Sequence, residues 1–308
     1  MISKINRLKK EKSAVILAHY YQTADIQDLA DFIGDSLELA QKAKETEADI
    51  IVFAGVHFMA ETAKILNPSK KILLPDLEAG CSLSDSCRAE DLEKAKEEYP
   101  DRKIIAYANC SAAVKELVDI TCTSGNAVKI VESFAPDQRL LFVPDKNLGG
   151  YINRITGRNM DLWDGSCAIH DMLSAENVLA LARQHPEAKI IAHPECNPAV
   201  LALAKFIGST SAMLRHISSD SGQSYIVATE TGITHQMKKA APNKTFYIVS
   251  NDQTCACNDC PHMKKNTIEK LYTCLRDETP EIILSPQTIE RARKPIEAML
   301  AVAPPVPR

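Results

Sequence analysis

One apolar stretch occurs three times along this chain of 308 residues, in nearly the same letters. The copies read VILAHYY, IIAYANC and IIAHPEC and occupy residues 15–21, 104–110 and 190–196. Each copy ends in polar residues at matching places, so that His19, Tyr107 and His193 are separated by 88 and 86 residues. Because self-similarity at a fixed period marks a repeated structural unit, we expect the chain to fold as three copies of one unit.

The similarity continues after each apolar stretch. A short helical stretch is followed by a turn of small residues, and the turns are Gly34-Asp35-Ser36, Thr123-Ser124-Gly125 and Gly208-Ser209-Thr210. Ser36, Ser124 and Thr210 each lie 17 residues after the polar strand-end residue. A second helix and a second apolar strand follow, the strands at residues 49–54, 139–143 and 224–228. A third helix and strand close the first and third units at residues 71–74 and 245–249, with a weak equivalent at 159–163.

Apolar, β-branched stretches that alternate with helical ones are typical of a parallel sheet covered by helices on both faces. We therefore predict the α/β class, with three homologous three-layer αβα domains whose parallel sheets surround a pseudo-threefold axis. The predicted domains span residues 1–84, 85–170 and 171–263, and a C-terminal helical segment and tail follows over residues 264–308. Ligands of such sheets bind beyond the carboxyl ends of the strands, so three equivalent edges are expected to share one central cavity.

Charge and hydropathy exclude several classes of partner. The net charge is −4, which gives no indication of the basic surface that nucleic acids or membranes require. The apolar core near the N-terminus, residues 14–18, is too short for a signal peptide or a membrane span. We expect no nucleic-acid or membrane partner and a cytoplasmic location. The sequence also lacks a glycine-rich phosphate loop and a nucleophile elbow, which disfavours a nucleotide-dependent enzyme and a serine hydrolase.

Ten cysteines are many for a chain expected in a reducing compartment, where a disulfide framework is disfavoured. Each unit reaches a cysteine at its end: Cys81, Cys167, and one of Cys255, Cys257 and Cys260. Three thiolates from separate loops suit a soft or borderline metal centre. On an iron–sulfur cluster they would leave one iron open to substrate as a Lewis acid. The small, buried residues are expected to be Cys110, Cys122, Cys196 and Cys274.

Spacing alone does not identify the third cysteine. In the first two units the cysteine follows the strand-end residue by 62 and 60 residues, whereas Cys255 lies 62 and Cys260 lies 67 residues after His193. Two local alternatives stay open. Cys255, Cys257 and Cys260 with His262 would make a structural zinc site, and Cys257 with Cys260 forms a Cys-x-x-Cys pair that can cycle as a disulfide.

The turns and the strand ends supply further candidates. Ser36, Ser124 and Thr210 each precede a predicted helix, where they would be ordinary N-caps. A helix N-terminus also favours anions, so three of them around one cavity would suit a substrate that carries carboxylates or a phosphate. The strand ends add an acid–base set of imidazoles, phenols, a carboxylate and an amide: His19, Tyr21, Tyr107, Asn109, His193 and Glu195.

Taken together, these motifs resemble the quinolinate synthase family from about His19 to about Met263 and into the C-terminal helix. The matching stretches are His19-Tyr20-Tyr21-Gln22, Gly34-Asp35-Ser36, Tyr107-Ala108-Asn109, Thr123-Ser124-Gly125, His193-Pro194-Glu195-Cys196, Gly208-Ser209-Thr210, Ala228-Thr229-Glu230-Thr231-Gly232 and Cys260-Pro261-His262-Met263. Each motif alone is weak, but the set is specific.

The resemblance implies three α/β domains around a [4Fe–4S] cluster and the condensation of iminoaspartate with dihydroxyacetone phosphate to quinolinate, the pyridine precursor of NAD. It implies cluster ligands Cys81, Cys167 and Cys260, since the family's third ligand precedes proline. It implies acid–base roles for Tyr21 and Glu195, assisted by His19 and His193. The implied substrate-binding residues are His19, Ser36, Tyr107, Asn109, Ser124, His193, Glu195, Ser209 and Thr210. An aspartate oxidase or dehydrogenase would supply iminoaspartate.

Two other functions remain possible on this sequence. One is a different cluster-dependent hydro-lyase that uses the same cavity for another hydroxy acid. The other is a non-catalytic iron–sulfur or zinc redox sensor, which would use Cys257 and Cys260 but would not need polar residues at the strand ends. Loss of the Glu195 carboxylate distinguishes an enzyme from a sensor. An enzyme would lose activity and keep its metal, whereas a sensor would be unaffected.

Overall fold

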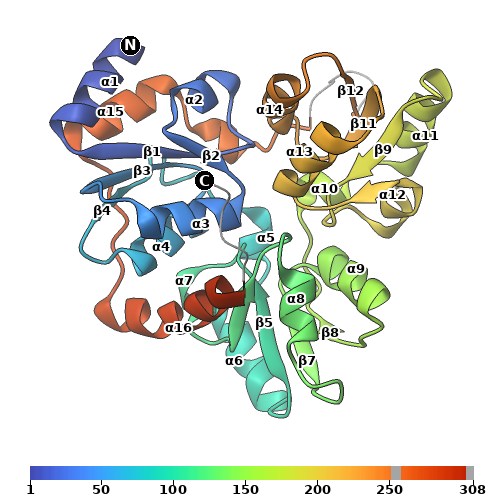
Figure 1. Ribbon diagram of the computed structural model, residues 1–308. Helices are drawn as coiled ribbons and strands as arrows, with labels where there is room; N and C mark the ends of the chain where they lie inside the picture. Colours follow the sequence, from blue (N-terminus) through green and yellow to red (C-terminus); the bar gives the residue numbers. More distant parts are fainter. Residues whose placement is uncertain (251–257, 303–308) are drawn as a thin grey trace.

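The computed structural model describes residues 1–250 and 258–302. It has three lobes around a common centre, blue, green and yellow-orange in Figure 1. Each lobe holds one four-stranded parallel sheet, with strand orders β2-β1-β3-β4, β6-β5-β7-β8 and β10-β9-β11-β12. The strand order is the same in all three sheets, so the predicted α/β class and threefold repeat are confirmed. The boundaries predicted between the domains stay predictions.

The strands match the apolar stretches of the sequence in most cases. Those of the first sheet are β1 (Ala14–His19), β2 (Phe32–Gly34), β3 (Ile50–Ala54) and β4 (Lys71–Leu73). Those of the second are β5 (Lys103–Tyr107), β6 (Ile120–Cys122), β7 (Leu140–Val143) and β8 (Asp161–Leu162). Those of the third are β9 (Lys189–Ala192), β10 (Phe206–Ile207), β11 (Ser224–Ala228) and β12 (Thr245–Ile248).

One strand of each sheet was absent from the sequence prediction. β2, β6 and β10 lie at a sheet edge, directly before the small-residue turns. They hold three residues or fewer, which is too short for an apolar pattern to be recognised. β8, expected to be weak, contains only two residues, and both are exposed.

Helices cover both faces of the sheets. The first lobe contains α1 (Ile2–Glu11), α2 (Ala24–Leu29), α3 (Ser36–Glu45) and α4 (His57–Leu66). The short helix α5 (Ser82–Asp85) follows, and its Leu83 packs in the core of the second lobe. The second lobe contains α6 (Ala89–Glu98), α7 (Ala112–Lys115), α8 (Ala127–Glu132) and α9 (Lys146–Thr156). The short helix α10 (Ala168–Asp171) follows, and its His170 contacts Glu195 and Thr229 of the third lobe. The third contains α11 (Ala175–Gln184), α12 (Pro198–Leu203), α13 (Thr210–Ser219) and α14 (Ile233–Ala240). None of the helices within the described ranges is long and apolar enough to cross a membrane.

Strand β3 illustrates why each sheet has helices on both of its faces. All five of its residues are buried. Val52 packs into a core with Ile5 and Leu8 of α1, whereas its neighbours Ile51 and Phe53 pack into a different core. Successive side chains of a strand point to opposite faces, so an uninterrupted apolar strand requires helices on both sides.

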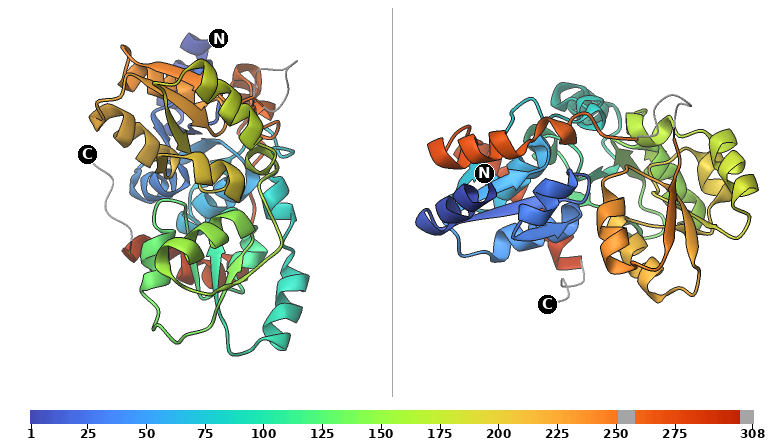
Figure 2. Two further views of the ribbon diagram at one scale, coloured as in Figure 1. Left: turned by 90° about the vertical axis from the view of Figure 1, so that its right-hand side faces the viewer. Right: turned by 90° about the horizontal axis from the view of Figure 1, so that it is seen from above.

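The C-terminal segment runs back across the first two lobes. It consists of a 3-10 turn (Met263–Lys265), α15 (Ile268–Asp277) and α16 (Pro286–Val302). α15 lies alongside α1, as both Figure 1 and the view from above in Figure 2 show. α16 packs on β6, α4 and α7 and contributes to the core of the second lobe. Cys255, Cys257 and the predicted tail at residues 303–308 lie outside the described residues.

Candidate functional site

A cavity at the centre of the molecule is lined by residues from all three lobes and the C-terminal segment. It spans about 680 Å³ of space not occupied by atoms, part of which is open to solvent. The predicted site residues that line it are His19, Tyr21, Ser36, Cys81, Tyr107, Asn109, Ser124, Cys167, His193, Glu195, Thr210 and Cys260. Of the predicted set, only Ser209 is missing from this lining.

Ser36 and Thr210 are not the N-caps that the sequence suggested. In α3 the cap is Asp35, whose side chain accepts from the backbone N–H groups of Leu37 and Glu38. In α13 the cap is Ser209, whose hydroxyl accepts from the Ala212 N–H at 3.3 Å. Because these preceding residues take the capping position, Ser36 and Thr210 become the first helical residues, and both line the cavity.

Ser124 also proves not to be a cap. The residue at the N-cap position of α8 is Asn126, two residues later, and its side-chain oxygen accepts from the Thr123 N–H at 2.7 Å. The turn is thereby closed on itself and Ser124 lines the cavity. In each lobe the turn thus brings a hydroxyl to the cavity wall that is not used to cap its helix.

The two strand-end histidines have the same local geometry. His19 Nδ1 accepts from the Tyr21 N–H at 3.1 Å, and His193 Nδ1 accepts from the Glu195 N–H at 3.4 Å. An accepting Nδ1 in a neutral imidazole places the proton on Nε2. Burial lowers the pKa of both histidines to about 3. At neutral pH each is therefore an uncharged imidazole with an Nε2–H donor.

A chain of polar contacts links the two strand-end residues Glu195 and Tyr21. Tyr107 Oη donates to Glu195 Oε1 at 2.5 Å. His170 Nδ1 lies 2.8 Å from Glu195 Oε2, and His170 Nε2 lies 2.9 Å from Thr229 Oγ1. Thr229 Oγ1 lies 2.9 Å from Tyr21 Oη. All five side chains thus belong to one connected network.

The surroundings shift the pKa values of the carboxyl and phenol groups of this network in opposite directions. Burial alone would raise the pKa of Glu195, but the neighbouring His193 and His170 and the hydrogen bond from Tyr107 lower it below its ordinary value. Burial, and then the nearby Glu195 charge, raise the pKa values of Tyr21 and Tyr107 well above the ordinary value. The network therefore holds the Glu195 carboxylate beside protonated phenols, which gives it a proton acceptor and a proton donor.

The cysteines divide into two groups by exposure. Cys81, Cys167 and Cys260 are partly exposed and line the cavity. The other described cysteines are buried: Cys87, Cys110, Cys122, Cys196 and Cys274. Burial raises the pKa of Cys81 to about 12, so its thiol is protonated until a cation displaces the proton. One thiol from each of three loops is a donor set that fits a soft metal centre.

Sequence reasoning assigned no role to His170, Thr229, Glu230 or Lys264. His170 lies three residues after Cys167, and its Nδ1 is 3.2 Å from the Cys167 Sγ. Ligand atoms of Cys167, His170 and Glu195 all lie within 4.8 Å of one another, so these residues could also hold a metal ion. Glu230 lines the cavity and pairs with Lys264. Two sequence features could have indicated these residues: the Cys-x-x-His spacing of Cys167 and His170, and the Thr229-Glu230 motif.

Comparisons with known proteins agree with the resemblance noted in the sequence. The family model described as "Quinolinate synthetase A protein" matches residues 3–301. A quinolinate synthase of Microcystis aeruginosa is 55% identical over 303 residues, which cover 98% of this chain and 95% of that protein. One from Trichodesmium erythraeum is 56% identical over 296 residues, 96% of this chain and 92% of its own. One from Chloroherpeton thalassium is 53% identical over 304 residues, 98% and 94% of the two chains.

Proposed function

The chain belongs to the quinolinate synthase family, whose members are enzymes of NAD biosynthesis, and we propose that it condenses iminoaspartate with dihydroxyacetone phosphate to quinolinate, with loss of phosphate and water. The observation that carries the proposal is the common cavity, where strand ends, turn hydroxyls and cysteines of three lobes meet. Both proposed substrates are small and anionic, and the cavity offers them hydroxyl and imidazole donors.

The proposed cofactor is a [4Fe–4S] cluster with Cys81, Cys167 and Cys260 as its ligands. These three cysteines reach the cavity, whereas the other described cysteines are buried in the cores. When bound, a cluster with three protein ligands supplies an open iron that acts as a Lewis acid toward substrate oxygens. The structure supports the donor set, and the zinc alternative with Cys255 and Cys257 falls on residues outside the described ranges.

Substrate binding is proposed to use the three turns. Ser36 and Thr210 stand at the first positions of two ten-residue helices, where backbone N–H groups and the helix dipole favour an anion. Ser124 adds a third hydroxyl from the middle lobe. Asn109 Oδ1 is buried and has no hydrogen-bond partner among the described residues, so it suits a donor on the substrate. The carboxylates and the phosphate of the substrates would thus be held by hydroxyl and backbone N–H donors rather than by positively charged side chains.

Proton transfer is proposed for Glu195 and Tyr21. The Glu195 carboxylate accepts a proton from substrate carbon or nitrogen, while Tyr107 and His170 keep it charged and oriented. Tyr21 Oη, with its raised pKa, is a proton donor to a departing hydroxyl. The Nε2–H groups of His19 and His193 would hydrogen-bond substrate oxygens and stabilise charge that develops there. A cytoplasmic location and supply of iminoaspartate by an aspartate oxidase or dehydrogenase complete the proposal.

Anaerobic purification followed by iron and sulfide analysis tests the cofactor. We expect about four irons per chain, and loss of the cluster when Cys81, Cys167 or Cys260 is changed to Ala. Cys274→Ala is the matched control, because this cysteine is buried in α15. Stoichiometric zinc in the parent, or a cluster retained in Cys81→Ala and Cys167→Ala, would contradict the proposal.

A quinolinate assay on the Glu195→Gln variant tests the reaction. Removal of a general base typically lowers the rate about 10²- to 10⁴-fold. We expect such a loss with the iron content unchanged. A variant with parental quinolinate formation would remove Glu195 from the chemistry, and a parent that binds a cluster but forms no quinolinate would favour a redox sensor or another hydro-lyase.

A further inference from the structure

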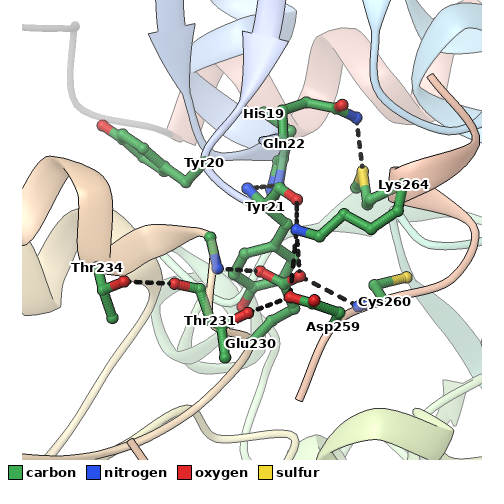
Figure 3. A network of polar contacts seen from close by, with 12 residues as sticks. His19, Tyr20, Tyr21, Gln22, Glu230, Thr231, Thr234, Asp259, Cys260 and Lys264 are labelled. Atoms are coloured by element: carbon green, nitrogen blue, oxygen red, sulfur yellow. Dashed lines mark hydrogen bonds and ion pairs between the residues drawn. The ribbon is translucent and has the colours of Figure 1, made fainter. Parts of the chain in front are cut away.

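An ion pair between the buried Glu230 and the partly exposed Lys264 lies beside the proposed metal centre (Figure 3). Glu230 follows the end of β11 and is 1% exposed. Its Oε1 accepts from Lys264 Nζ at 2.7 Å and from the Cys260 N–H at 3.1 Å. Its Oε2 accepts from the Gly232 N–H at 2.6 Å. Both carboxylate oxygens are therefore engaged by donors from the protein, and one of those donors is the backbone of Cys260.

Lys264 connects the same carboxylate to the first lobe. Its ammonium also donates to the backbone carbonyl of Tyr21 at 2.6 Å. The other end of Tyr21, its phenol, lies 2.9 Å from the hydroxyl of Thr229, the neighbour of Glu230. Figure 3 shows Lys264 lying between the Tyr21 segment and Glu230. One lysine thus joins the first lobe, the third lobe and the segment that carries Cys260.

A buried charge without a partner is strongly unfavourable, and charge-assisted hydrogen bonds are stronger than neutral ones. The Glu230 carboxylate and the Lys264 ammonium therefore restrain the groups that they contact. Residues that hydrogen-bond to the segments bearing metal ligands control how well those ligands are oriented. The contacts of this pair reach the backbone of Cys260 and the backbone of Tyr21.

We propose that Glu230 and Lys264 are a positioning pair that fixes the backbone of Cys260 relative to Tyr21 and so holds the third thiolate of the metal centre in place. The inference rests on the proposed function, because it takes Cys260 as a cluster ligand. Neither residue is assigned a step in the chemistry.

Lys64 provides a matched control in the same chain. Its ammonium lies 3.2 Å from Glu281 Oε1 and 2.9 Å from the Lys70 carbonyl oxygen. Lys264 likewise contacts one carbonyl and the Glu230 carboxylate, and its Nζ also lies 3.6 Å from Asp259 Oδ1. Its side chain is 10% exposed, compared with 21% for Lys264. Lys64 is absent from the cavity lining. Lys64→Met therefore removes a comparable ion pair without touching the proposed centre.

The experiment follows cluster release from the anaerobic holoenzyme. An iron chelator is added to the parent, Lys264→Met, Lys264→Arg, Glu230→Gln and Lys64→Met, and the cluster absorbance is recorded over time. We expect release from Lys264→Met and Glu230→Gln to be about 10- to 100-fold faster than from the parent. Lys264→Arg should restore much of the parental rate, and Lys64→Met should release its cluster at the parental rate. The electron paramagnetic resonance spectrum of the reduced cluster should change in the first two variants only.

Three results would overturn the inference. The first is parental release and a parental spectrum in both Lys264→Met and Glu230→Gln, in which case the pair is structural only. The second is equal acceleration in Lys64→Met, which would indicate general destabilisation. The third is a complete cluster in Cys260→Ala, which would also remove the proposed ligand. The first two outcomes leave the proposed function intact, whereas the third does not. Because Glu230→Gln keeps the shape of the side chain, it serves as the test if Lys264→Met does not fold.

Discussion

The imidazole of His170 meets the carboxylate of Glu195 at 2.8 Å, between Nδ1 and Oε2. The contact joins α10 to the residues that follow β9 of the third lobe. On the opposite side of the ring, Nε2 contacts Thr229, which in turn contacts Tyr21. A neutral imidazole can donate from Nδ1 and accept at Nε2. His170 is thus suited to keep the Glu195 carboxylate charged and correctly oriented.

Substitution of His170 is expected to lower kcat without removing the substrate-binding groups. Gln places its amide near the position of Nε2 and loses the contact with Glu195, so we expect a fall in kcat of about 10- to 100-fold. Asn places its amide near Nδ1 and should lose less. Steady-state kinetics on both variants, with iron content measured in parallel, provides the check. Equal activity in His170→Gln and the parent would show that the Glu195 contact is not needed.

Ser209 and Thr210 are adjacent but are expected to respond differently. Ser209→Ala removes the N-cap of α13 and should lower the free energy of unfolding by about 1 kcal/mol. Thr210→Val keeps the shape of the side chain but removes a hydroxyl from the cavity wall. If that hydroxyl binds a charged group, about 1.5–3 kcal/mol of binding is lost, and KM rises about 10-fold or more.

Thermal unfolding and steady-state kinetics on the two variants separate these effects. The expected pattern is a lower midpoint with near-parental KM for Ser209→Ala, and the reverse for Thr210→Val. A raised KM in Ser209→Ala with no change in stability would mean that Ser209 binds substrate after all, as the sequence resemblance implied.

The sequence predicted which residues would share the cavity because the repeat preserves position. His19, Tyr107 and His193 occur at the carboxyl ends of matching strands, one in each sheet, and all three line the cavity. The assignment of hydroxyls to caps failed by one residue at Ser36 and Thr210 and by two at Ser124, because the capping position depends on where the backbone turns into the helix. A pattern of apolar residues leaves that point uncertain by a residue or two.

The contacts between lobes could not be predicted from one unit. His170 meets Glu195, and Lys264 meets Tyr21, only because the three sheets pack around the same centre. No spacing along the chain encodes these distances. The same limit applies to Cys260, which the proline of the family motif indicated and the interval count did not.

Glu278 is expected to make stability depend on pH in the acidic range. Hydrogen bonds from Lys12 and Lys71 lower its pKa to about 2 from an ordinary value of 4.5. The folded carboxylate thus stays charged while the unfolded one takes up a proton. Its contribution is present above about pH 4.5 and is lost as the pH falls toward 2. The effect should be modest, because partly exposed ion pairs contribute about 0–1 kcal/mol each.

Thermal unfolding of Glu278→Gln across the acidic range is the measurement. The midpoint difference from the parent should be largest at pH 6 to 7 (roughly where both forms are ionised) and should vanish toward low pH. Glu93→Gln, at an exposed position of α6, is the control and should show no such trend. A difference that grows as the pH falls would contradict the assignment.

The helix α16 is expected to be part of the core of the second lobe although it follows the third in sequence. Ile296 is fully buried in the cluster that contains Ile105 and Phe142. Ile296→Ala should therefore lower the free energy of unfolding by about 2–5 kcal/mol, because buried methylene groups are lost and a cavity remains. Ile283→Ala is the control: this side chain is 73% exposed, and its loss should change stability by about 0.5 kcal/mol or less. Chemical unfolding of both variants measures the difference. If Ile296→Ala were no less stable than Ile283→Ala, α16 would not contribute to the core, and removing it would leave the second lobe folded.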